Sequence, residues 1–383
     1  MKCNSKCVNC YENAIRDQIT PHYNLDRVIE SLNREIKNHD TVTIHGGEPL
    51  MIDVNHLDRL LDIIYRAKGQ TGIQTNLQLL NEYHIELFKK YKTHVGISID
   101  GLHEKSNRSR GYNPEPVFAS IERLQNEKIS MSAIIILWKS NAREVTELVE
   151  ALATYGIKDF RINPGIAFCD PELEVDNYEL YCAWKRLFDG WMHLTINPIR
   201  DIIDLLMGHK NSTCNFSGCD PYRTSAEVTL YEDGTFGNCL KSGSALDGFR
   251  SCRADERVCS RQDMLRQLSI ERGGCGGCRF WSICQGGCPG EAVDFDWRNK
   301  SRFCEAWRDI FKYVESRLRG MFPNIALASD IRDISAGGVL SSIDKSTWQQ
   351  QYKKNILSIS PQPATNGHGD IPHGDSHGDH NDG

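Results

Sequence analysis

The chain has 383 residues, of which 39% are hydrophobic, and it carries a formal net charge of -6, which predicts a globular protein with one large domain and a smaller one. Its composition argues against a membrane protein, because no apolar run approaches the roughly 18 residues that cross a bilayer, and against nucleic-acid binding, because no basic face is indicated. The chain has no room for a signal peptide before its first motif, so we expect a cytoplasmic protein.

Three closely spaced cysteines, Cys3, Cys7 and Cys10, open the chain. The chain has fifteen cysteines and no export signal, and this favours metal binding over disulfides because the cytosol keeps thiols reduced. A [4Fe-4S] cluster usually takes four cysteines, so a loop with three leaves one iron open for another ligand. The alternative is a structural zinc site, which needs a fourth ligand, and the nearest downstream histidine is His22.

Strand-like and helical segments then alternate up to about residue 165, which is typical of a parallel sheet or barrel. Short apolar strands rich in β-branched residues are predicted at 41–45, 72–75, 94–99, 132–137 and 158–162. Amphipathic helices are predicted at 24–37, 55–68, 82–91, 116–127 and 142–155. Glycines or polar residues follow the strands, where a βα barrel places its active site.

The rest of the chain is predicted to be a helical connector at about 176–207, a cysteine-dense region of loops wrapped around metal at 214–304, and a last amphipathic helix at 305–319. Cys169 and Cys182 have no near neighbours and are expected to be ordinary buried thiols. The stretch 362–383 is rich in Gly, His and Asp and is expected to be disordered. It is either a solubilising tail, a tail that binds divalent metal, or a peptide that visits an active site.

The cysteine loop, the turn Gly46-Gly47-Glu48-Pro49 and the segment Ser98-Ile99-Asp100-Gly101 together resemble the radical S-adenosylmethionine (SAM) superfamily. The resemblance implies an α/β fold, a partial (βα)6 barrel, in which a [4Fe-4S] cluster on Cys3, Cys7 and Cys10 binds SAM and generates a 5'-deoxyadenosyl radical. It also implies that the Gly46–Pro49 turn contacts the SAM ammonium. The implied cofactor-binding set is Gly46, Gly47, Glu48, Pro49, Asn76, Ser98, Asp100 and Arg110.

Within this set, the resemblance directs Ser98 and Asp100 toward the ribose. Arg110 would reach the cofactor carboxylate, for which a planar bidentate donor is suited, or would be a solvated loop charge. Two features depart from the family pattern. The strand that usually precedes the cysteine loop is absent, and Asn9 stands where an aromatic residue usually precedes the third cysteine. We interpret the first departure as a truncated chain or a start site assigned too far downstream.

The second cysteine set resembles the SPASM extension of radical enzymes that modify peptides and proteins. Its spacing runs from Cys219 to Gly234-x4-Cys239, then Cys275-x2-Cys278-x5-Cys284-x3-Cys288, and ends at Cys304. The family pattern implies one auxiliary [4Fe-4S] cluster on Cys214, Cys219, Cys239 and Cys288, and a second on Cys275, Cys278, Cys284 and Cys304. Fully ligated clusters suit electron transfer. A zinc-ribbon-like fold is the alternative, and Cys252 and Cys259 fall outside the pattern.

These features predict four parts: a radical SAM core at 1–170, a connector at 171–213, a SPASM domain with its closing helix at 214–320, and an extension at 321–383. The resemblance implies a radical SAM enzyme that abstracts a hydrogen atom from a peptide or protein, with flavodoxin or ferredoxin as electron donor. Sulfatase-maturing relatives have an acidic base after the cysteine that matches Cys239, whereas this chain has Leu240, although Tyr231, Glu232, Asp233 or Lys241 could supply a base. We therefore favour a carbon-carbon cross-linking cyclase. The alternatives are a thioether-forming or sulfatase-maturing type of enzyme, or a non-catalytic iron-sulfur protein.

Overall fold

The computed structural model describes residues 3–8, 10, 23–166, 171–209, 214–216, 218–222, 227–239 and 259–330. These residues belong to one compact unit, Met1–Gly338. The predictions for the tail at 362–383 and for His22, Cys169, Leu240 and Cys252 lie outside the described residues. For Cys214 the backbone is described, but the side chain is not.

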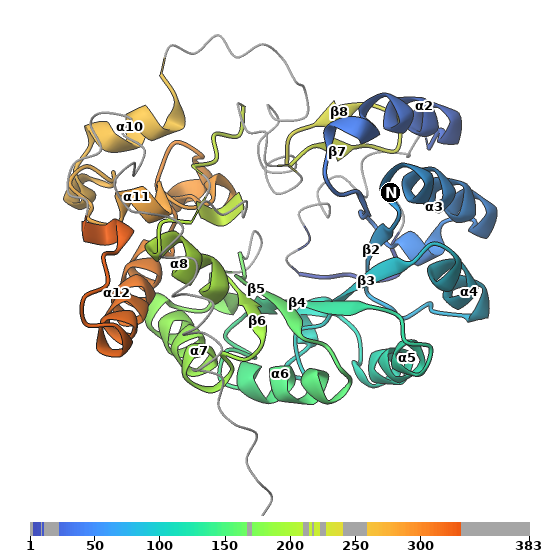
Figure 1. Ribbon diagram of the computed structural model, residues 1–383, viewed down its shortest axis with the longest axis horizontal. Helices are drawn as coiled ribbons and strands as arrows, with labels where there is room; N and C mark the ends of the chain where they lie inside the picture. The colour runs from blue at the N-terminus through green and yellow to red at the C-terminus, as the bar shows by residue number, and fades with distance from the viewer. Residues whose placement is uncertain are drawn as a thin grey trace, which may run out of the picture. The chain divides into compact units, whose positions relative to one another are not determined.

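A six-stranded sheet forms the centre of this unit, with all its strands parallel and in chain order (Figure 1). The register is continuous across the sheet; Ile73, for example, pairs with Ile44 on one side and Val95 on the other. The strands are β1 Thr43–Ile44, β2 Thr71–Thr75, β3 Thr93–Ser98, β4 Met131–Leu137, β5 Asp159–Pro164 and β6 Thr195–Asn197. The first five agree with the predicted segments to within about two residues at each end, as expected for boundaries. The α/β fold with a partial barrel is therefore confirmed.

Helices cover one face of the sheet because alternate strand residues are apolar and require burial. Val95 and Ile97 of β3 and Ile135 and Leu137 of β4 are fully buried against them. The helices that follow the strands are α3 Val54–Lys68, α4 Glu82–Lys90, α5 Glu115–Asn126, α6 Val145–Thr154, α7 Asn177–Gly190 and α8 Ile199–Leu206. α3 shows how the sequence sets the limits of a helix, since the Asp53 side chain caps its first turn and Gly69 ends it at a φ of 74°.

The sixth strand was not predicted, because Thr195–Asn197 lies within the stretch expected to be a helical connector. Its three residues are too few for an alternating pattern to stand out between two apolar helices, α7 and α8. β6 nevertheless pairs with β5 from Asp159 to Arg161 and so extends the sheet by one parallel strand. The connector is therefore a helix-strand-helix continuation of the βα pattern.

A second, two-stranded sheet packs on helix α2, Leu25–Glu35. Its strands are β7, Thr229–Leu230, and β8, Phe236–Gly237, which pair antiparallel. The Ser31 hydroxyl of α2 donates to the Gly234 carbonyl at 2.7 Å, and Arg34 lies over the Phe236 ring. Figure 1 shows this hairpin beside α2, so a segment of the second cysteine region lies against the start of the chain.

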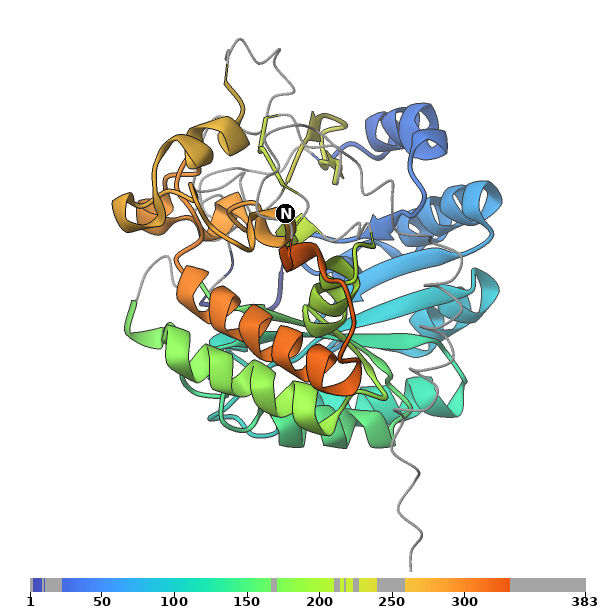
Figure 2. The ribbon, with the colours of Figure 1, turned by 60° about the vertical axis from the view of Figure 1, so that its left-hand side comes forward.

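The C-terminal part is joined to the barrel through α12, Cys304–Met321, which lies alongside α7 in both views (Figures 1 and 2). Their contact is a stack of Trp184 on Trp307, with ring centroids 4.0 Å apart. Two shorter helices, α10 Arg261–Gln267 and α11 Trp281–Cys284, stand among the loops that carry the later cysteines. No helix in the described ranges combines the length and apolar character that crossing a membrane requires.

Candidate cofactor site and cysteine clusters

Glu48 holds together the ends of the first two strands. The turn before it requires left-handed backbone at Gly46 (φ 91°) and Gly47 (φ 53°), which glycine adopts without strain. The buried Glu48 carboxylate accepts hydrogen bonds from the Thr75 hydroxyl at 2.5 Å, the Asn76 backbone N–H at 2.8 Å and the Leu50 N–H at 3.0 Å. Burial raises the pKa of Glu48, and these bonds oppose the shift. The side chain is thus a structural clamp under the turn.

Asn76 connects this clamp to the cysteine loop. Its side-chain amide donates to the Asn4 oxygen at 2.9 Å and to the Ser5 hydroxyl at 3.0 Å. Gln78, two residues further on, donates to the same Ser5 hydroxyl at 2.8 Å. Ser5 is buried by these contacts. The segment after β2 therefore fixes the part of the loop between Cys3 and Cys7.

The other side of the cysteine loop rests on the turn after β3. The Val8 N–H donates to the Ser109 carbonyl at 2.8 Å, and the Cys7 thiol lies 3.6 Å from the Arg110 carbonyl oxygen. Within the loop, the Cys10 N–H donates to the Cys7 carbonyl at 3.2 Å. Polar segments that follow two different strands thus converge on one loop, at the edge where a βα barrel binds its ligands.

The three loop thiols are close enough to affect one another electrostatically. Burial raises the pKa of Cys7 to about 11, the Arg110 charge opposes this, and Cys10 and Cys3 add to it. A thiol in this state is protonated at neutral pH, whereas metal ligation requires a thiolate. Three sulfur donors on one supported loop, with Cys3 and Cys10 both acting on Cys7, fit an iron-sulfur cluster with one open iron.

Arg110 is buried, so the interpretation as a solvated loop charge is wrong. Its guanidinium pairs with Asp100 at 2.9 Å, while its Nε has no hydrogen-bond partner. Asp100 also accepts from the Ser109 hydroxyl at 2.8 Å and the Ile136 N–H at 2.8 Å, so both carboxylate oxygens have protein partners. Asp100 therefore holds Arg110 in place, and its contact with a ribose stays a prediction.

Ser98 lies at the end of β3 on the face away from the helices. Its hydroxyl accepts from the Gln74 amide at 2.8 Å, and its carbonyl accepts from the Tyr112 hydroxyl at 2.5 Å. Gln74 and Ser98 are therefore joined across two neighbouring strands. Ser98 is partly exposed, which leaves it able to contact a ligand at this edge.

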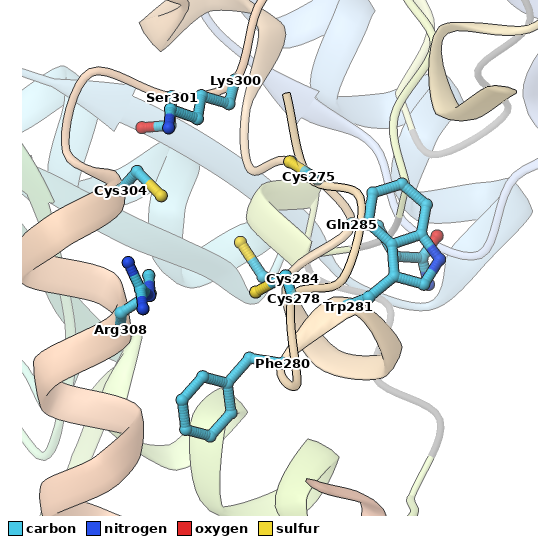
Figure 3. Close-up of a pocket in the computed structure, with 11 residues that line it drawn as sticks. Cys275, Cys278, Phe280, Trp281, Cys284, Gln285, Lys300, Ser301, Cys304 and Arg308 are labelled. Carbon is cyan, nitrogen blue, oxygen red and sulfur yellow. The ribbon is translucent and has the colours of Figure 1, made fainter. Parts of the chain in front are cut away.

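The four cysteines predicted for the second auxiliary cluster line one pocket (Figure 3). They are Cys275, Cys278, Cys284 and Cys304, and they come from a glycine-rich loop, the end of α11 and the start of α12. Figure 3 shows their sulfur atoms around a common space, with Lys300 and Arg308 at its rim. Four sulfur donors around one space fit a fully ligated [4Fe-4S] centre.

The charges around this pocket support the same interpretation. Burial raises the pKa of Cys275 to about 12, and the neighbouring thiols Cys304 and Cys278 add to the shift. Burial also raises the pKa of Cys284 and Cys304, and Lys300 opposes the shift at Cys304. Thiols that disfavour each other's negative charge are stabilised as thiolates when a cation binds between them.

Parts of the first auxiliary set also come together. Cys219 and Cys288 both lie close to the guanidinium of Arg261, which donates to the Cys219 and Gly287 carbonyls. Next to Cys239, the Asn238 amide donates to the Pro221 carbonyl at 2.8 Å, which brings that strand end to the Cys219 loop. The role of Cys214 stays a prediction, because its side chain is not described.

The remaining described cysteines have other surroundings. Cys182 on α7 is only half-buried and interacts with the exposed Tyr178, so the expectation of an ordinary buried thiol is wrong. Cys259 is exposed. Among the described residues, no three His, Cys, Asp or Glu side chains are grouped as ligands of a single metal ion.

Several residues at these sites have no signal in the sequence. Asn4, Ser5, Gln78 and Tyr112 act through contacts between segments far apart in the chain, and none belongs to a recognisable motif. Arg261 is the most informative of those missed, because a buried arginine is rare unless it has a partner. Arg261 lies outside every motif in the sequence, so nothing around it predicts burial.

Comparison with known proteins finds a family model that matches the N-terminal part and relatives that cover most of the chain. Residues 1–152 match the family model described as the radical SAM superfamily. The cysteine-type anaerobic sulfatase-maturating enzyme of Clostridium perfringens strain 13 is 23% identical over 370 residues, covering 84% of this chain and 96% of the relative. The serine-type anaerobic sulfatase-maturating enzyme of Klebsiella aerogenes is 22% identical over 301 residues, covering 72% of each.

Two solved structures share the fold. Native anSMEcpe with bound AdoMet and Cp18Cys peptide superposes with a TM-score of 0.66 at 19% identity, covering 85% of this chain and 97% of that one. Streptococcus suis SuiB bound to the precursor peptide SuiA superposes with a TM-score of 0.55 at 18% identity, covering 79% and 74%. At these identities the likeness establishes the fold.

Proposed function

We propose that the protein is a radical SAM enzyme that modifies a peptide or protein, because residues 1–152 match the radical SAM superfamily model. The family binds a [4Fe-4S] cluster and SAM, which together supply a 5'-deoxyadenosyl radical that abstracts a hydrogen atom. Sulfatase-maturating enzymes are among the relatives that cover most of this chain, and one structural neighbour was solved with its precursor peptide. Both observations support a peptide substrate.

The cofactor would be held by the loop and turns described above. Cys3, Cys7 and Cys10 would ligate the cluster, and the left-handed glycines of the Gly46–Pro49 turn would let backbone groups approach the SAM ammonium. Arg110, buried with an unpartnered Nε, can donate to the SAM carboxylate while Asp100 fixes its position. Ser98 would reach the ribose, and Asn76 would support the cysteine loop.

The single observation that carries the oxidative part of the proposal is the pocket lined by Cys275, Cys278, Cys284 and Cys304. A site with four protein ligands has no open iron and suits electron transfer rather than substrate binding. We assign both auxiliary sites to moving electrons between the substrate and a flavodoxin or ferredoxin.

Anaerobic reconstitution tests this proposal. The full chain should bind about twelve irons if three [4Fe-4S] clusters form, and it should release 5'-deoxyadenosine from SAM in the presence of dithionite. A C7A variant, in which one ligand of the first loop is removed, is the control and should release none. A colourless protein with stoichiometric zinc would refute the cluster assignments, and twelve irons without 5'-deoxyadenosine would favour a non-catalytic iron-sulfur protein.

Within this class we favour a carbon-carbon cross-linking cyclase acting on a ribosomally made peptide. The reason is Leu240, which provides no base directly after Cys239. Asp233, one of the nearby alternatives, accepts from the Thr235 N–H and hydroxyl inside the β7–β8 turn, so it already has a structural role. Mass spectrometry of a candidate peptide incubated with the reconstituted protein separates the outcomes, since a cross-link removes two hydrogen atoms and retains sulfur.

Sulfatase maturation is the second candidate, favoured by the similarity over 84% of this chain to a cysteine-type enzyme. Conversion of a cysteine to formylglycine replaces sulfur by oxygen and removes two hydrogen atoms, which gives a different mass change from cross-linking. A thioether link would remove two hydrogen atoms and consume a thiol, so thiol alkylation after the reaction distinguishes it from a carbon-carbon bond.

A further inference from the structure

Arg261 is a buried cation at the start of α10. Its side chain is among the largest fully buried ones in the described residues. The helix beginning there is capped by Ser260, whose hydroxyl accepts from the Asp263 N–H, and the Arg261 N–H donates to Asp220 at 2.8 Å. The backbone is therefore fixed on both sides, and the guanidinium extends inward to the cysteine loops.

Every N–H of this guanidinium is directed at a backbone carbonyl. Nε donates to Trp297 at 2.5 Å, Nη1 to Gly287 at 3.0 Å and Cys219 at 3.4 Å, and Nη2 to Asn299 at 2.8 Å and Gly286 at 3.3 Å. The five acceptors come from three separate loops. Gly286 and Gly287 have left-handed φ values of 88° and 69°, which direct two of the carbonyls inward. One side chain thus joins the loops of both predicted auxiliary sites.

Carbonyl dipoles satisfy the hydrogen bonds of Arg261 but do not neutralise its charge. No ion pair found among the described residues includes its guanidinium. The ionisable side chains that act on its charge are thiols, namely Cys288 and Cys219 from the first predicted auxiliary set and Cys275 and Cys284 from the second, whereas the Asp220 carboxylate binds its backbone N–H. Burying a charge without an opposite charge is costly, so an anionic partner is expected beside it.

We propose that Arg261 is the shared counter-cation of the two auxiliary clusters, and that it both joins their loops and raises their reduction potentials. The inference rests on the proposed function, because it requires two clusters at these cysteines. A cubane on four thiolates is anionic and gains a further negative charge on reduction. A fixed positive charge beside it therefore favours the reduced state, an effect that low dielectric strengthens. Arg261 is a positioning and tuning residue and does not contact the substrate.

The test is a redox titration followed by electron paramagnetic resonance, made on the reconstituted full chain and again in a C3A/C7A/C10A background where only auxiliary clusters titrate. R261Q removes the charge, R261K keeps the charge but cannot reach five carbonyls, and R272Q removes an exposed arginine nearby as the control. R261Q should disfavour reduction of both clusters at least tenfold, which is about 59 mV for one electron. R261K should change reduction less than threefold, and R272Q should not change it.

If R261Q binds both clusters and one or both potentials stay unchanged, the proposal is wrong. If R261Q loses both auxiliary clusters while R261K keeps them, the requirement for charge is supported. Loss of both clusters in R261Q and R261K alike would mean that the hydrogen bonds alone matter, which also overturns the proposal. Failure of the proposed function looks different, because wild-type protein would then either bind about four irons or fewer, or bind about twelve irons and release no 5'-deoxyadenosine while its auxiliary clusters still titrate.

Discussion

At the scale of single residues, the Asn76 amide offers a sharp test of how the N-terminal cluster is supported. N76A removes the donor to Asn4 and Ser5 and leaves the buried Ser5 with one partner fewer, at a cost of about 1–3 kcal/mol in the free energy of unfolding. We expect iron content to fall by about one third, because only the first cluster depends on this loop. Iron analysis and 5'-deoxyadenosine release measure the effect, and the exposed Asn126 gives the control N126A.

The thiol of Cys275 leads to a prediction about pH. Its pKa is raised to about 12 in the cluster-free fold, from an ordinary value near 9, so the folded state holds the proton more tightly than the unfolded chain does. The resulting stabilisation is complete below pH 9 and is lost as the pH rises toward 12. Urea titrations of cluster-free protein should therefore show stability falling from pH 8.5 to 10.5. The fall of the free energy of unfolding with pH should be smaller in C275S. It should be unchanged in C259S, whose thiol is exposed.

The site residues that could be predicted from the sequence are the cysteines, because their close spacing is typical of ligands to one metal cluster. Cys275, Cys278 and Cys284 are separated by two and five residues and line one pocket as their spacing predicts, and Cys304 joins them from farther along the chain. The partners that hold Arg110 and the cysteine loop could not be predicted in the same way. Asn76 meets Ser5 across 71 residues of sequence, once the segment after β2 and the cysteine loop lie together. Asp100 and Arg110 are only ten residues apart, but Asp100 is held in place by the Ile136 N–H of the neighbouring strand β4.

Among elements, the β7–β8 hairpin depends on one glycine. Gly234 has a φ of 84°, and a Cβ atom there would lie 2.9 Å from the Cβ of Arg27 and 3.0 Å from its backbone carbonyl. G234A should therefore cost about 1–3 kcal/mol through strain and overpacking and should loosen the hairpin from α2. Limited proteolysis would detect the loosening. Gly69 also has a left-handed backbone, but its surroundings are open. The G69A variant therefore measures backbone strain alone, and the additional loss in G234A measures overpacking.

Prediction at this scale succeeded where a strand follows the repeated strand-helix pattern and failed for β6 and the hairpin strands, which are short and lie outside it. β2 to β5 each have at least five residues of apolar or β-branched character and lie close to their predicted positions. β6 has three residues and is stabilised by pairing with β5, a tertiary contact that local sequence does not encode. The hairpin strands, with two residues each, depend in the same way on packing against α2.

At the scale of the whole compact unit, the barrel and the later cysteines are coupled through α12. This helix begins at Cys304, which lines the four-cysteine pocket, and one turn later presents Trp307 to the barrel. Trp307 stacks on Trp184 of α7 and meets Phe216 edge to face at 4.9 Å. The placement of a predicted cluster ligand therefore depends on an aromatic core more than a hundred residues away in sequence.

The W307A variant should weaken the coupling between the barrel and the later cysteines. Removing a fully buried tryptophan costs about 3–5 kcal/mol of unfolding free energy and leaves a cavity between α7 and α12. We expect the cluster in the four-cysteine pocket to be lost before the N-terminal one, because Cys304 moves with α12 while Cys3, Cys7 and Cys10 are supported by strand ends. Iron content and redox titration of the reconstituted variant measure this order. Y178A, which removes an exposed aromatic from α7, should leave stability within about 0.5 kcal/mol and iron unchanged. Equal loss of all three clusters in W307A would contradict the coupling through α12.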